Sequence, residues 1–105
     1  MPSPQSLLIP AESAAEGEIF STLLERPGLK IERIESRGHA SPEGFWYQQV
    51  QEEWVLLLRG WAVLAIENQP DVRLVGGDSW LIPPSVRHRV VEVSEDALWL
   101  AVHVG

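Results

Sequence analysis

Glu53 and His88 are the two residues of this sequence whose types best suit chemistry. A carboxylate inside a folded domain is costly unless it is paired, hydrogen-bonded or bound to a cation, and an imidazole is a natural partner. Carboxylate and neutral imidazole together also suit zinc, iron, nickel or manganese. We therefore take Glu53 and His88 as the candidate catalytic residues, as metal ligands or as groups that take up and release protons.

Polar residues precede Glu53 at alternate positions, at Tyr47, Gln49 and Gln51. Because successive side chains of a regular strand point to opposite faces, all four would project from one face. Such a set either lines a wet cavity or forms a hydrogen-bonded cluster. We expect a polar pocket in which the side-chain oxygen of Gln49 joins Glu53 and His88 as a ligand of a weakly held divalent metal (Zn, Fe, Ni or Mn).

Two further residues could extend this pocket. His103 shares a face of the last predicted strand with Trp99 and Ala101 and would complete an alternative ligand set. Trp46 is the tryptophan to test in the pocket, while the other four are expected in the core or in an interface.

The elements that must position these residues have the pattern of short β-strands. Turn residues separate them at spacings of roughly 8–12 residues, which is typical of an all-β sandwich or barrel. Residues 1–17 are interpreted as a loose arm or first edge strand, and Glu18–Glu25 fits a short helix or a strand. The predicted strands are Leu29–Ser36, Phe45–Leu58, Trp61–Glu67, Val72–Val75, Ser79–Ile82, His88–Val93 and Ala97–Val104.

Both faces of the strand that contains Glu53 are apolar near its end. Glu53 and Val55 share one face, and Trp54, Leu56 and Leu58 share the other. Only one face of a strand lines a barrel interior, so the other must be covered. We predict a homodimer through that face, with cover by the N-terminal arm as the alternative.

The segment that ends at His88 resembles the second motif of the cupin family. Gly77, Pro83 and His88 stand at that motif's spacing, whereas Ser85 replaces its second glycine and Glu92 stands where asparagine is usual. Glu53 and Gly60 fit the second half of the first cupin motif. The two histidines of that motif would fall at Tyr47 and Gln49, so this chain resembles a group of small cupins that lack the histidine pair.

The resemblance covers about residues 31–103 and implies a jelly-roll β-barrel. It predicts one cupin domain over residues 1–105, with the barrel from about residue 18. In the family, the usual metal set would be the two histidines and the glutamate of the first motif and the histidine of the second, and only Glu53 and His88 survive here. Cupins include enzymes and binding modules, so the fold alone does not choose a function.

Composition narrows the partners. The 105 residues fit one domain, and a net charge of −7 with only eight Lys and Arg argues against nucleic acid and against an anionic membrane surface. The absence of cysteine excludes disulfides, thiolate zinc sites and cysteine nucleophiles. We expect a cytoplasmic protein, because the N-terminus has no signal-peptide pattern and no apolar run is long enough to span a bilayer.

Three functions remain open from the sequence. One is a small metal-assisted enzyme that acts on a small polar molecule. A second is a metal-free module that binds or senses a small molecule without catalysis. In a third, the pocket is vestigial and the dimer surface matters. Whether the chain is an enzyme is not decided at this level.

Overall fold

The computed structural model of the chain describes residues 3–9 and 17–105, and its regular structure there is all β. This confirms the predicted fold class. None of the described residues forms a helix of the length and hydropathy that a membrane crossing requires. The eight strands are β1 (Ile19–Arg26), β2 (Leu29–Glu35), β3 (Glu52–Arg59), β4 (Trp61–Ile66), β5 (Val72–Val75), β6 (Ser79–Ile82), β7 (His88–Val93) and β8 (Leu98–Val104).

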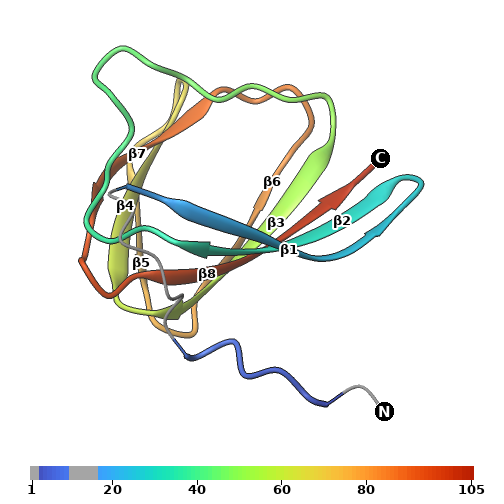
Figure 1. Cartoon of the computed structure of the whole chain (residues 1–105). Coiled ribbons are helices and arrows are strands. Elements are labelled where there is room, and N and C mark those ends of the chain that lie inside the picture. The colour runs from blue at the N-terminus through green and yellow to red at the C-terminus, as the bar shows by residue number, and fades with distance from the viewer. Residues whose placement is uncertain (1–2, 10–16) are drawn as a thin grey trace.

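The strands form two antiparallel sheets that wrap around a common interior (Figure 1). The larger sheet has the order β1-β2-β8-β3-β6, and the smaller has the order β5-β4-β7. The chain passes from one sheet to the other at the turn between β3 and β4, where Gly60 has a φ of 87°. That turn joins the strand of Glu53 to the strand that pairs with β7, which begins with His88.

The core lies between the two sheets and follows the alternation of the strands. In β3, Glu53, Val55 and Leu57 are buried while their neighbours are only half buried, as predicted for this strand. The same period-two pattern buries every second residue of β4. The buried apolar side chains of the core cluster are Val55, Leu57, Ala62, Leu64, Ile66, Leu74, Ile82, Val93, Ala97, Trp99 and Ala101.

The predicted strand Phe45–Leu58 was wrong in its first half. β3 begins at Glu52, and the preceding residues make only an isolated bridge between Tyr47 and His88. The backbone of Tyr47 exchanges two hydrogen bonds with His88, of 2.7 and 3.0 Å, and Gln49 accepts one of 2.7 Å from Ser85. This segment therefore lies beside the start of β7, a strand of the smaller sheet, and does not extend β3.

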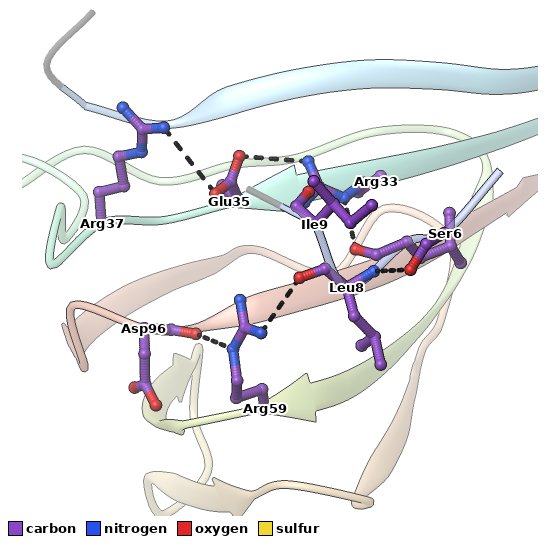
Figure 2. Close-up of polar contacts among 9 residues, drawn as sticks. Ser6, Leu8, Ile9, Arg33, Glu35, Arg37, Arg59 and Asp96 are labelled. Carbon is purple, nitrogen blue, oxygen red and sulfur yellow. Dashed lines mark hydrogen bonds and ion pairs between the residues drawn. The ribbon is translucent and has the colours of Figure 1, made fainter. Parts of the chain in front are cut away.

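The N-terminal arm crosses the outer face of the larger sheet (Figures 1 and 2). The Arg33 guanidinium donates to the backbone oxygens of Leu7 and Ile9, at 2.8 and 2.6 Å. Arg59 donates to the backbone oxygen of Leu8, at 3.4 Å. The arm thus covers part of this face, as the alternative to a dimer required, although residues 1–2 and 10–16 of the predicted arm lie outside the described residues.

Arg33 explains why the arm attaches there. It is only 6% exposed, and its guanidinium has five N–H donors that must find acceptors once water is excluded. Glu35 lies 3.1 Å away and is itself buried, with Arg37 on its other side at 3.9 Å (Figure 2). Because this carboxylate and the arm carbonyls share the charge, the buried guanidinium is compensated.

An apolar row crosses the outer face beside the arm. The strand registers align one residue from each of the five strands of the larger sheet. Its last member is Leu81, which is 47% exposed. The row consists of Leu24, Ile31, Val102, Trp54 and Leu81.

Candidate functional site

A cavity of about 200 Å³ is lined by residues of both sheets. At roughly 30 Å³ per molecule, this volume would hold six or seven waters or one small organic molecule. The lining comes from β1, β2, β3, β7, β8 and the segment before β3, so both sheets contribute. The lining residues are Glu18, Phe20, Glu32, Ile34, Tyr47, Gln49, Glu53, His88 and His103.

Glu53 and His88 meet in this cavity from opposite sheets. They are 8% and 7% exposed, and Glu53 Oε1 lies 3.7 Å from His88 Nε2. His88 Nδ1 lies 3.1 Å from the Val86 carbonyl, so the hydrogen on the ring is best placed on Nδ1, where it can donate. Nε2 of that neutral form then turns a lone pair toward the Glu53 carboxylate. With this tautomer no hydrogen joins Nε2 to the carboxylate directly, so a shared proton, a cation or a polar ligand between them would complete the contact.

Gln49 and His103 extend this pair into a continuous polar chain. The Gln49 amide donates to Glu53 Oε1 at 2.8 Å and lies 3.5 Å from His103 Nδ1. His103 Nε2 lies 2.8 Å from Glu32 Oε1. With Nδ1 accepting and Nε2–H donating, every contact has a donor and an acceptor, so Gln49 holds Glu53 while Glu32 holds His103.

Tyr47 and Phe20 stand at the mouth of the cavity. The Tyr47 ring stacks on His88 with centroids 5.8 Å apart, and the Phe45 ring packs edge-on against it at 4.9 Å. Tyr47 is 37% exposed and Phe20 is 55% exposed. Burial, followed by the charges of Glu18 and Glu53, raises the pKa of Tyr47 above its ordinary value, so the phenol is held neutral.

The structure separates two predicted pocket residues from the rest. Trp46 is not among the residues that line the cavity, and its ring lies under the Arg87 guanidinium at 5.5 Å. Gln51 is also outside the lining and donates to the Gly105 carbonyl at 3.3 Å. The alternation from Tyr47 to Glu53 fails because these residues do not form one regular strand.

Four lining residues were missed by the sequence reasoning. Glu18 directly precedes β1 and Phe20 lies near its start, and the sequence did not distinguish this strand from a helix. Glu32 and Ile34 share one side of β2, and the alternation did predict that they lie together. What the pattern lacked was which side of β2 faces the interior, since both sides carry charged and apolar residues.

The described residues do not fit a resident transition metal. No three of their histidine and acidic side chains converge as a metal site. His103 is engaged with Glu32, and Gln49 presents its amide nitrogen to Glu53, whereas the predicted ligand was its oxygen. An amide nitrogen that donates a hydrogen bond has no lone pair for a metal.

Comparison with solved structures finds chains of the same shape. A proposed mannose-6-phosphate isomerase from Ralstonia eutropha JMP134 is 42% identical, with 98% of each chain covered and a TM-score of 0.90. A cupin superfamily protein from Desulfitobacterium hafniense DCB-2 is 17% identical, with 99% and 92% covered and a TM-score of 0.80. KdgF from a Halomonas species is 19% identical, with 89% and 84% covered and a TM-score of 0.73. No protein-family model and no curated protein matches the sequence.

These comparisons differ in sequence identity and therefore in what they show. The two more distant structures share the fold. The Ralstonia protein shares more than two in five residues along nearly the whole chain, so the relationship to it extends beyond the fold to the sequence.

Proposed function

This chain belongs to the cupin superfamily, and we propose that it binds a small polar molecule in the cavity and exchanges a proton with it through Glu53 and His88. The observation that carries the proposal is the buried pair of Glu53 Oε1 and His88 Nε2, which lie 3.7 Å apart in the lining of the cavity. A bound hydroxyl or amine between them would supply the missing donor.

The proposed chemistry is general acid–base catalysis without a resident metal. Glu53 accepts a proton from the bound molecule, and the Gln49 amide keeps the carboxylate oriented. Return of that proton to a neighbouring atom completes an isomerisation, which consumes no other reactant. The isomerase in the name of the Ralstonia relative supports this reaction class.

The phosphorylated substrate in that name is not carried over to this chain. Three carboxylates line the cavity, and within the described part of the chain neither lysine nor arginine does. Phosphate recognition in proteins uses arginine, lysine or backbone amides, and a phosphate dianion beside these carboxylates would be repelled.

Solvent deuterium exchange tests the proposal directly. Small sugars, polyols, amines and hydroxy acids are first screened for binding by ligand-observed NMR, and the ligands found are then incubated with the protein in D₂O. We expect deuterium to enter a carbon–hydrogen position of a bound ligand, and the exchange rate to fall about 10²- to 10⁴-fold in Glu53→Gln and His88→Asn. Glu52→Gln, next to Glu53 on the other face of β3, is the matched control and should exchange like the parent chain.

Two outcomes would contradict parts of this proposal. Binding without exchange would leave a metal-free binding module and remove the catalytic step. Elemental analysis that finds near-stoichiometric metal, lost when Glu53 or His88 is replaced, would replace the metal-independent mechanism with a metal-assisted one.

We also propose that the apolar row on the outer face is covered by a second copy of the chain. Specific interfaces bury roughly 800 Å² per partner, and a row across five strands offers a continuous surface for one. The arm is held beside this row by Arg33 and Arg59 and could extend the same interface.

Leu81→Arg is expected to convert the dimer to a monomer, because a charge in the apolar row would be buried without a partner. Val75→Arg is the matched control, since both residues are 47% exposed but Val75 lies on the smaller sheet. Sedimentation velocity should give about twice the chain mass of 11.7 kDa for the parent and for Val75→Arg. A parent chain that stays monomeric at all concentrations would contradict the dimer.

A further inference from the structure

We propose that the ligand of this cavity is a small organic ammonium ion, which enters between Phe20 and Tyr47 and lies against the carboxylates of Glu18, Glu32 and Glu53. This inference rests on the proposed function, because it names the chemical class that the same cavity selects.

The charges around the cavity are unbalanced. Of the nine lining residues that the structure describes, three are carboxylates, two are histidines and none is a lysine or arginine. Lys30 lies 3.6 Å from Glu32 but is 39% exposed and is not a lining residue. Even when Lys30 is counted, carboxylates outnumber ammonium groups three to one, so a bound cation would be attracted and an anion repelled.

Besides this negative charge, the cavity has two aromatic rings at its exposed side. Phe20 and Tyr47 both line the cavity and remain more than a third exposed, and Phe45 holds the Tyr47 ring edge-on. Ring faces attract ammonium and quaternary ammonium groups through their quadrupole. Aromatic rings in the same lining as carboxylates suit such cations, since the rings also accommodate the alkyl groups.

Burial and negative charge in the cavity shift the pKa values of two of its own lining residues, Tyr47 and Glu18. Burial first, and then the charges of Glu18 and Glu53, raises the pKa of Tyr47, so a further negative group is disfavoured there. Burial raises the pKa of Glu18, and His39 lowers it only in part. A ligand cation would relieve both effects, because it places a positive charge beside the desolvated carboxylate.

His88 provides an independent indication that a polar ligand belongs here. Its side chain is 9% exposed, and its Nε2 faces the cavity with Glu53 at 3.7 Å, beyond hydrogen-bond distance. The N–H groups of an ammonium ion, or the hydroxyl of an amino alcohol, could donate to this nitrogen and to the Glu53 carboxylate together.

Choline and its neutral isostere 3,3-dimethylbutan-1-ol separate charge from shape. Isothermal titration is done with both compounds, with methylammonium and ethanolamine, and with mannose 6-phosphate as the anion. We expect at least one ammonium ion to bind, choline to bind about tenfold or more tightly than its isostere, and mannose 6-phosphate not to bind detectably.

Glu18→Gln tests the assignment within the cavity, since it removes a charge and keeps the size. We expect it to weaken ammonium binding about tenfold and leave the isostere unaffected, while Glu67→Gln, whose residue pairs with Arg87 at the surface, changes neither. Phe20→Leu should weaken ammonium binding about two- to fivefold.

The outcomes separate this inference from the proposed function. If neutral compounds bind as tightly as ammonium ions, or the phosphate binds more tightly, the charge assignment is overturned while binding in the cavity stands. If no compound of any charge binds at millimolar concentration, both proposals fail.

Discussion

Gly60→Ala is expected to lower the free energy of unfolding by roughly 2–6 kcal/mol, a large part of the stability of a domain of this size. Gly60 has a φ of 87°, a backbone conformation that side chains with a Cβ rarely adopt. An added Cβ would also lie 2.3 Å from Ser94 Oγ and 2.9 Å from the Ala97 Cα. Backbone strain and overpacking therefore add at one position.

The contact matters because it lies between two turns at which the chain passes from one sheet to the other, β3 to β4 and β7 to β8. Ser94 accepts a hydrogen bond from the Trp61 amide at 3.0 Å and donates its own amide to the Trp61 carbonyl at 2.9 Å. A methyl group at Gly60 would push against this pairing. Since β3 carries Glu53 and β4 pairs with the strand of His88, the same displacement would misplace the candidate site.

Variants of two other glycines separate the effect of backbone strain from the effect of overpacking. Gly28 has a φ of 75° but no atom of the described residues within 4 Å of the added Cβ, so Gly28→Ala should cost only the left-handed strain of about 1–2 kcal/mol. Gly76 lacks a positive φ and has only ordinary contacts at 3.6 Å, so Gly76→Ala should change stability by less than about 1 kcal/mol. Urea unfolding of the three variants measures this order. Equal losses at Gly60 and Gly28 would mean that the close approach to Ser94 is absent.

Strand positions were predictable where turn residues and alternation agreed. β5, β6 and β7 have the predicted bounds, because Gly76-Gly77, Pro83-Pro84 and Ser94-Glu95-Asp96 each end an apolar run. The inward position of His103 also followed from alternation, since it shares its face with the buried Trp99 and Ala101.

The site was only partly predictable, because its lining depends on long-range pairing. Tyr47 and Gln49 do line the cavity, but through a bridge to β7 that no local pattern indicates. Glu18 directly precedes β1, a strand that the sequence could not distinguish from a helix. Ser85 shows a similar limit. It has a φ of 64° where the family motif has glycine. The backbone therefore keeps the left-handed conformation of the motif, which a serine in the sequence does not indicate.

The double variant Tyr47→His, Gln49→His is expected to bind one zinc or nickel ion tightly, whereas the parent chain binds neither. These two positions are where the family motif has its histidines. Both residues line the cavity, and the Gln49 amide is 2.8 Å from Glu53 Oε1. With His88 Nε2 also facing Glu53, the variant would assemble three imidazoles and one carboxylate, a donor set that suits both metals.

Elemental analysis after metal loading and gel filtration measures the number of metal ions bound per chain. Thermal unfolding measures how much the bound metal stabilises the fold. At a free metal concentration of 100 times Kd, bound metal adds about 2.7 kcal/mol of stability. Adding His88→Ala to the double variant should abolish the effect. Gln48→His, Val50→His is the matched control, because these exposed positions alternate with the two cavity residues.

The result would decide why this chain departs from its family. If the double variant takes up metal and the control does not, the cavity still has the shape of a metal site, and Tyr47 and Gln49 alone removed it. The parent residues then act in a different chemistry, with an aromatic ring at the entrance and an amide that fixes Glu53. If the double variant stays metal-free, the contacts of His103 with Glu32 and of Gln49 with Glu53 are parts of a wider rearrangement, in which Glu53 and His88 no longer converge on one point.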